Sequence, residues 1–153
     1  MTNKYAKYFP THDDFDLEEF PYYLISQVHA LYINKIDDSL KKHGLDNSRR
    51  RILLAASTRQ DASISDLAEM ALIKIPTTTK IIYRLKDEGY VETSLCENDN
   101  RVTRVALTKL GHEMVIKINE ITSLLFNDSF SGLKPSDIKR LNESLRVIKN
   151  NLA

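Results

Sequence analysis

The apolar residues of this chain recur at two spacings, and each spacing predicts a different kind of element. A period near 3.6 residues, typical of a helix with a buried face, first extends from about Leu17 to Lys42. The same period returns in the segments 48–58, 63–73, 75–89, 110–125 and 136–152. In 90–97 and 102–108 apolar and polar residues alternate instead, which predicts two strands joined by a turn at 97–101. The chain is therefore expected to form four helices, a β-hairpin and two more helices.

Turn and capping residues indicate where these elements end. Gly44 and Gly89 are expected to stop the first and fourth helices, because glycine readily adopts the left-handed backbone at a helix C-terminus. Three helices are expected to begin at residues that are common at helix N-termini. These are Asp46 or Asn47 for the second helix, Ser65 for the third and Pro76 for the fourth.

The predicted first helix is apolar on two sides. One stripe contains Phe20, Leu24, Val28 and Leu31, and the other contains Tyr22, Ile25, His29, Ile33, Ile36 and Leu40. In a small protein such a helix is expected to pack against its own core on one side and a second subunit on the other. The acidic run from Asp13 to Glu19 precedes this helix, and we interpret it as favourable to the helix dipole.

This order of elements predicts the fold class: mainly α with a small β-hairpin wing. Two short helices followed by a hairpin make a winged helix-turn-helix, framed here by N- and C-terminal dimerisation helices. The expected regions are 1–45 for an arm and the first dimerisation helix, 46–108 for the winged region and 109–153 for the C-terminal dimerisation helices. A dimer of this kind presents two reading helices to two DNA half-sites about one helical turn apart.

Composition excludes several other classes of protein. The 153 residues carry a net charge of +1, so overall charge gives no reason to expect a polyanion partner. No apolar run of about 18 residues exists and the first residues lack a signal-peptide core, so we expect a cytoplasmic protein without membrane contact. The single Cys96 excludes an internal disulfide, and the four dispersed histidines suggest no metal site. No cofactor is expected.

The predicted fourth helix concentrates positive charge locally. Between Met70 and Lys86 there are four basic residues and no acidic one. The expected DNA contacts in this region are Lys74, Pro76, Thr77, Thr79, Lys80 and Arg84. Lys80 can donate to guanine, and Pro76 or a threonine methyl can touch a thymine methyl. The alternative interpretation is a solvated basic face on a surface helix.

The hairpin tip supplies two more arginines. Arg101 lies at the turn, where it is expected to enter a minor groove beside the reading helix. Asp99 is expected to hold this guanidinium through a bidentate pair. Arg104 is expected on the outer face of the strand, in contact with phosphate. Alternatively, Asp99 and Arg101 only stabilise the turn.

Asp99-Asn100-Arg101, followed by Val105, Leu107-Thr108 and Gly111, resembles the wing signature of the MarR family of bacterial transcriptional regulators. The segments ISDLAEMALI and TTTKIIYRLKDEGYVE are similar to that family's helix-turn-helix. The resemblance covers essentially the whole chain. It implies an obligate homodimer that binds a pseudo-palindromic operator, usually as a repressor, and is released by a small ligand. Glu92 departs from the family's common basic residue, which puts one phosphate contact in doubt.

The resemblance also implies a ligand pocket where the first, second and fifth helices meet, often used by phenolic or aromatic carboxylic acids. The residues expected to line it are Tyr22, Ser26, His29, Arg49 and Arg50. At least one of the consecutive arginines 49–51 should face a helix interface, where a guanidinium can bind a carboxylate. The alternative is that these arginines pair with Asp37, Asp38 or the acidic arm, while Tyr22 and His29 pack in the dimer interface.

Other mechanisms have less support in the sequence. Redox sensing would need a stabilised thiolate, and Glu97 beside Cys96 is expected to disfavour one. No phosphate-binding loop, nucleophile elbow or convergent carboxylate pair indicates an enzyme. A helical adaptor that uses its winged helix to bind protein is the second hypothesis, because fold alone does not determine function.

Overall fold

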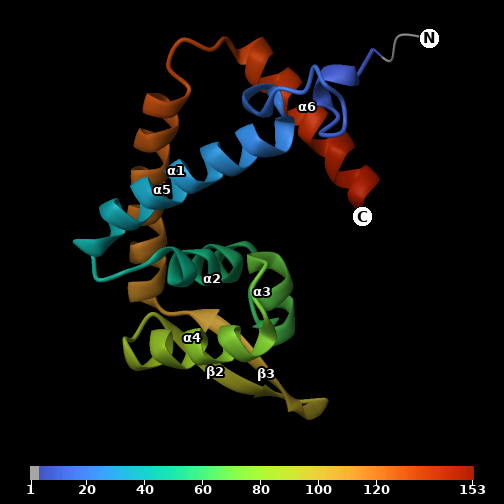
Figure 1. Cartoon of the computed structure of the whole chain (residues 1–153). Coiled ribbons are helices and arrows are strands. Elements are labelled where there is room, and N and C mark those ends of the chain that lie inside the picture. Colours follow the sequence, from blue (N-terminus) through green and yellow to red (C-terminus); the bar gives the residue numbers. More distant parts are fainter. Residues whose placement is uncertain (1–3) are drawn as a thin grey trace. The chain divides into compact units, whose positions relative to one another are not determined.

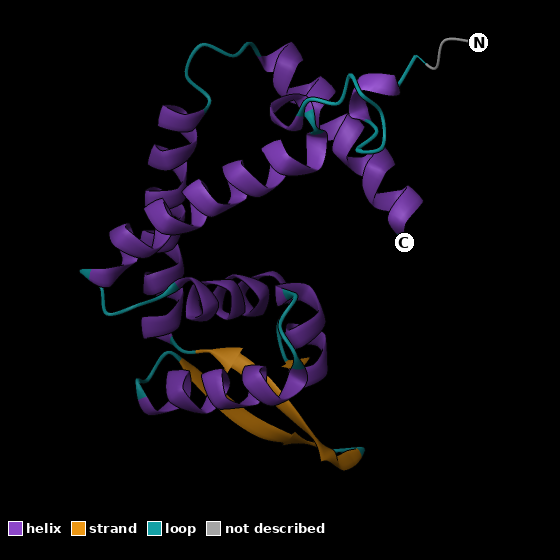
Figure 2. Cartoon of the chain, viewed as in Figure 1, coloured by secondary structure: helices purple, strands orange, loops and turns teal. Residues whose placement is uncertain are grey.

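The computed structural model describes residues 4–153, and its elements are mostly helices with three strands (Figures 1 and 2). The helices are α1 Pro21–Lys41, α2 Asn47–Thr58, α3 Ile64–Ala71, α4 Ile75–Asp87, α5 Lys109–Ser129 and α6 Pro135–Leu152, preceded by the 3-10 turns η1 Ala6–Tyr8 and η2 Leu17–Glu19. The strands are β1 Ala62–Ser63, β2 Val91–Cys96 and β3 Asp99–Leu107. The predicted fold class is confirmed. The chain divides into two compact units, the first ending at Ile121 and the second beginning at Thr122.

The winged region is organised around one antiparallel sheet with strand order β1-β3-β2. Val91 on β2 lies opposite Leu107, and Ala62 on β1 lies opposite Val105. Helices α2, α3 and α4 pack against this sheet (Figure 2). Fully buried side chains from all three helices fill the space between them and the sheet. These include Ile52, Leu53, Leu67, Ile82 and Leu85. The sequence analysis did not predict strand β1, so this strand is an addition to the prediction.

Two glycines end helices as predicted. Gly44 and Gly89 have φ of +70° and +84°, the left-handed region that favours glycine. Asp46 caps α2 as expected, since its Oδ1 accepts a hydrogen bond from the Arg49 N–H at 2.9 Å. Pro76 lies in the first turn of α4, also as predicted.

Two predicted N-termini were wrong. Ser63, not Ser65, caps α3, because its hydroxyl accepts from the Asp66 N–H while the Asp66 carboxylate accepts from the Ser63 N–H. The acidic run does not cap α1, which begins at Pro21 with no acidic residue in its first turn. Asp16 instead caps η2 by accepting from the Glu18 N–H.

Thr108 and Gly111 fix the root of the wing. The Thr108 hydroxyl donates to the Gly89 carbonyl oxygen at 2.6 Å and accepts from the Gly111 N–H at 3.1 Å. A Cβ atom at position 111 would lie 2.1 Å from the carbonyl oxygen of Tyr90. Only glycine therefore lets α5 begin this close to the chain that leaves α4.

Much of the apolar surface of α1 is exposed to solvent when a single chain is considered. Ile36 and Leu40 are buried, whereas Leu24, Val28 and Leu31 are exposed, with 65 % of the surface of Val28 accessible. The structure describes all of α6, and none of the residues of this helix is buried. None of the described helices is long and apolar enough to span a membrane.

Candidate nucleic-acid interface

Helix α4 separates a buried face from a basic exposed face. Thr78, Ile82 and Leu85 are buried, and Ile81 is half-buried, as the helical period predicted. The opposite face exposes the predicted contacts Pro76, Thr77, Lys80 and Arg84, and also Tyr83. Thr79 is half-buried, and its hydroxyl donates to the Ile75 carbonyl oxygen at 2.9 Å.

The N-terminus of α4 is suited to an anion. Lys74 is the residue before the helix, and its side chain makes no capping hydrogen bond. The first turn also contains no acidic residue in this fully described helix. The helix dipole therefore favours a phosphate at this end.

The wing tip presents Arg101 to solvent. The Asp99 Oδ1 atom accepts from the Arg101 backbone N–H at 3.0 Å and from its Nε at 3.2 Å. The predicted bidentate pair was therefore wrong, because both donors meet one carboxylate oxygen. The Arg101 side chain is 91 % exposed, which leaves the terminal guanidinium nitrogens accessible.

Arg104 is less accessible than Arg101. Its Nη1 donates to the Asp61 carbonyl oxygen at 3.3 Å, and its Nη2 lies 3.8 Å from the Sγ atom of Cys96. The side chain is half-buried on β3. A phosphate contact by Arg104 stays a prediction. To make it, Arg104 would have to give up its contacts with Asp61 and Cys96.

The expected electrostatics of Cys96 were wrong in direction. The backbone N–H of Asn98, the Arg104 guanidinium and the backbone N–H of Asp99 hold the pKa of the Cys96 thiol below its usual value. These donors stabilise the thiolate, whereas the prediction considered only the neighbouring Glu97.

Sequence reasoning missed an ion-pair network at the C-terminal end of α4. The Arg49 Nη1 atom donates to both carboxylate oxygens of Glu88, at 2.6 and 2.9 Å. Arg84, one turn earlier on α4, donates its Nε to the same carboxylate at 3.1 Å. Arg49 also lies 3.4 Å from Asp46. Arg49 and Glu88 are 39 positions apart, so no local pattern indicates their contact.

Arg50 is a buried cation held by uncharged groups. Its Nε donates to the Asn47 side-chain oxygen and its Nη2 to the Tyr32 hydroxyl, both at 3.2 Å. The guanidinium also lies 5.7 Å from the centre of the Tyr32 ring. Only 7 % of the residue is exposed, and this burial lowers the pKa of the Arg50 guanidinium. One of the consecutive arginines therefore does face a helix interface, between α2 and α1.

The other predicted ligand residues lie on α1 and are exposed. Tyr22, Ser26 and His29 occupy its N-terminal half, and the Ser26 hydroxyl donates to the Tyr22 carbonyl oxygen at 2.8 Å. His29 is three residues before Tyr32, so the two are neighbours on the helix surface. The structure therefore brings Arg50 to the same helix as these residues, while Arg49 faces the end of α4.

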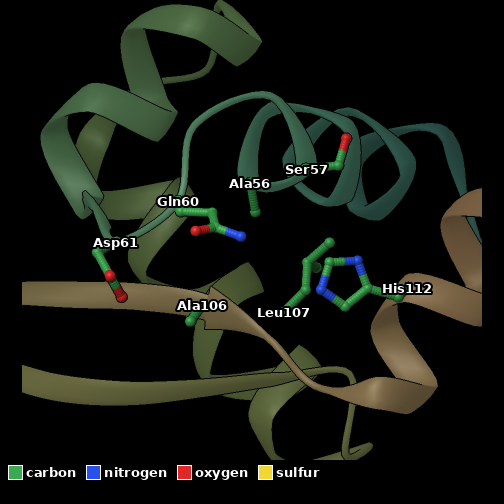
Figure 3. Close-up of a pocket in the computed structure, with 7 residues that line it drawn as sticks. All are labelled: Ala56, Ser57, Gln60, Asp61, Ala106, Leu107 and His112. Atoms are coloured by element: carbon green, nitrogen blue, oxygen red, sulfur yellow. The ribbon is translucent and has the colours of Figure 1, made fainter.

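A small cavity of about 200 Å³ lies between the end of α2, the end of β3 and the start of α5 (Figure 3). Its lining residues are Ala56, Ser57, Gln60, Asp61, Ala106, Leu107 and His112. In Figure 3, Gln60 and His112 approach it from opposite sides. None of the predicted ligand residues lines this cavity. In residues 4–153 no group of three or more His, Cys, Asp or Glu side chains could hold a metal ion.

Some known proteins are similar to this chain in sequence, and others in fold. The model of the MarR family matches residues 45–103. The HTH-type transcriptional repressor IacR of Pseudomonas putida is 38 % identical, over 94 % of this chain and 86 % of its own. The structure of Bordetella bronchiseptica BpsR, whose DNA binding is regulated by 6-hydroxynicotinic acid, has a TM-score of 0.79 at 20 % identity, covering 88 % of this chain and 96 % of its own. CouR of Rhodococcus jostii RHA1 bound to p-coumaroyl-CoA has a TM-score of 0.78 at 17 % identity, covering 87 % and 94 %.

Proposed function

The chain belongs to the MarR family of winged-helix transcriptional regulators, and on that basis we propose that it is a homodimeric repressor of a pseudo-palindromic operator. Members of this family regulate transcription by binding DNA and are not enzymes, so the predicted family and the absence of an enzymatic role are confirmed. In the proposed mechanism a small anionic aromatic ligand releases the protein from DNA.

The observation that carries the proposal is the exposed basic face of α4 beside the exposed arginine of the wing. In the proposed complex Lys80, with Pro76 and Thr77, reads base edges in the major groove. Lys74 and the uncapped start of α4 hold a backbone phosphate. Arg101 enters the neighbouring minor groove, where the negative potential is strongest. Thr79, Arg84 and Arg104 are proposed to assist at the flanks.

The apolar surface of α1 supports the homodimer. Leu24, Val28 and Leu31 form one exposed stripe, which water would disfavour on an isolated monomer. A second copy offers the same stripe, so a two-fold interface can cover both. The dimer in turn gives two reading helices for the two halves of an operator.

Fluorescence anisotropy tests the function directly. The purified protein is titrated into a duplex from upstream of its own gene and into a scrambled duplex, over a series of salt concentrations. We expect tight binding to the first duplex that survives scrambled competitor and weakens as salt rises. Equal affinity for upstream and scrambled duplexes would reject sequence-specific recognition at this site. Absence of binding to any tested duplex would favour the helical adaptor instead.

Lys80→Ala is expected to reduce the preference for operator over scrambled DNA by about 1–3 kcal/mol, because a side chain that reads a base contributes mainly to discrimination. The anisotropy titration measures it with both duplexes. Lys42→Ala removes the same charge beyond the C-terminal end of α1 and should leave the preference unchanged. Equal losses on both duplexes would mean that Lys80 contacts phosphate and does not read a base.

Arg50 supports an anionic effector. A buried guanidinium whose bonded partners in the described chain are uncharged lacks a direct counterion, and a ligand carboxylate can supply one. The Tyr32 ring beside it suits an aromatic body. Tyr22, Ser26 and His29 are proposed to add hydrogen bonds from α1, whereas Arg49 is paired with Glu88 at the end of α4. Ligands of this kind, 6-hydroxynicotinic acid and p-coumaroyl-CoA, act on or bind BpsR and CouR.

Arg50→Met is expected to leave operator binding intact and to raise the effector concentration needed for release about tenfold or more, because a charge-assisted hydrogen bond is lost. The measurement is release of labelled operator by a panel of aromatic carboxylic acids, each paired with its uncharged amide. Arg51→Met is the matched control, since Arg51 donates to the Leu72 carbonyl oxygen on the other side of α2. Unchanged release of Arg50→Met, or equal release by acids and amides, would contradict the proposed ligand contact.

A further inference from the structure

Glu88 occupies a position that the helix dipole alone would disfavour. It is the C-cap residue of α4, where the partial negative charge of the helix end repels a carboxylate. The same carboxylate accepts hydrogen bonds from two arginines, Arg49 and Arg84. These cations account for an acidic side chain at this place.

Arg49 anchors Glu88 from the buried side. The Arg49 side chain is buried, and its Nη1 contacts both carboxylate oxygens of Glu88. Its Nε lies 3.4 Å from the Asp46 Oδ2 atom, in an ion pair without hydrogen-bond geometry. Glu88 is therefore the main hydrogen-bond acceptor for this guanidinium, and the pair fixes the carboxylate relative to α2.

Arg84 meets the same carboxylate from the solvent side. Only its Nε is bonded to Glu88, while its side chain remains 61 % exposed on the outer face of α4. A guanidinium has two edges that can each take a bidentate acceptor. With the Nε side occupied, the two terminal nitrogens stay available in a restricted orientation.

We propose that Glu88 is a positioning residue that aims Arg84 at a DNA phosphate beside the reading helix, and that buried Arg49 holds Glu88 for this purpose. The proposal rests on the proposed function. An arginine that is already restrained loses less side-chain freedom when it binds a phosphate. Glu88 acts through Arg84 and does not itself touch DNA.

The sign of one substitution distinguishes this role from simple electrostatics. Glu88→Gln removes a negative charge close to the DNA, which by Coulomb attraction alone would tighten binding. Positioning predicts the opposite, a loss of operator affinity of about three- to tenfold. Asp87→Asn removes the same charge from the exposed neighbouring residue and should leave affinity unchanged or slightly higher.

A double-mutant cycle with Arg84→Gln completes the test. Arg84→Gln should weaken binding and lower the salt slope by about 0.9, as expected for one lost phosphate contact. The double variant should be no weaker than Arg84→Gln alone, because Glu88 acts only through Arg84. Additive losses, or affinity of Glu88→Gln equal to or above that of the wild type, would overturn the proposal.

Thermal denaturation of each variant controls for folding. If Glu88→Gln does not fold because buried Arg49 loses the charge of Glu88, the variant Arg49→Met with Glu88→Gln removes both charges and carries the same expectation. Wild-type protein that fails to bind its operator would overturn the proposed function together with this inference. Wild-type binding combined with an additive cycle would overturn the positioning role alone.

Discussion

Gly111→Ala is expected to lower the free energy of unfolding by about 3 kcal/mol, because the new methyl group has no space at the root of the wing. Its Cβ would lie 2.1 Å from the carbonyl oxygen of Tyr90, a backbone atom that cannot rotate away. The start of α5 must then shift away from the chain that joins α4 to β2. Urea denaturation followed by circular dichroism, at one fixed protein concentration, measures the loss.

Gly44→Ala is the matched control for this experiment. Gly44 has φ of +70°, and a Cβ built there meets no atom within 4 Å among the described residues. That variant should lose only about 1–2 kcal/mol, the usual cost of a left-handed backbone with a side chain. If the two variants lose the same amount, the close approach at Gly111 is not what requires glycine there.

Val28→Asp is expected to convert the proposed dimer into a monomer and to weaken operator binding by about a hundredfold or more. A carboxylate in the middle of the exposed apolar stripe would have to lose its water on association, which costs far more than the interface regains there. A monomer also loses the gain from engaging two half-sites at once. Light scattering after size-exclusion chromatography measures the mass, and anisotropy measures the affinity.

Asn34→Asp tests whether added charge alone is responsible. It introduces one negative charge on an exposed part of α1 outside the stripe of Leu24, Val28 and Leu31. This variant should remain dimeric and bind the operator. A dimeric Val28→Asp protein with normal affinity would place the interface elsewhere on the chain.

Local pattern was enough to predict the elements that position the candidate DNA contacts. The buried positions of α4 follow the 3.6-residue period, because each turn places the same face against the sheet. Alternation predicted both long strands, and the glycines at 44 and 89 predicted two helix ends. In each case the determining residues lie within a few positions of one another.

Two errors arose from local signals that were present but not weighed correctly. Ser63 is followed three residues later by Asp66, the spacing of a capping box, and this pair takes precedence over Ser65. Pro21 is the first residue of α1, a position that proline favours, so the helix begins after the acidic run.

Other features could not be predicted because they depend on contacts distant in the sequence or on turn geometry. β1 has two residues, too few to show a period, and it exists because Ala62 pairs with Val105 on β3. The bond between Arg49 and Glu88 requires α2 and α4 to pack first. The lowered pKa of Cys96 depends on backbone N–H groups whose direction only the turn determines.

The hydrogen bonds of Thr108 have a consequence for the spacing of half-sites. They join the end of α4 and the beginning of α5 through a single side chain. The reading helix and the wing therefore cannot bend independently of each other at this point. In the proposed dimer, one inserted base pair would move the second half-site by about 3.4 Å and rotate it by roughly 35°. A stiff attachment cannot follow that displacement by bending at the wing root. The affinity of the protein would then depend on the spacing between the two half-sites as well as on their base sequence.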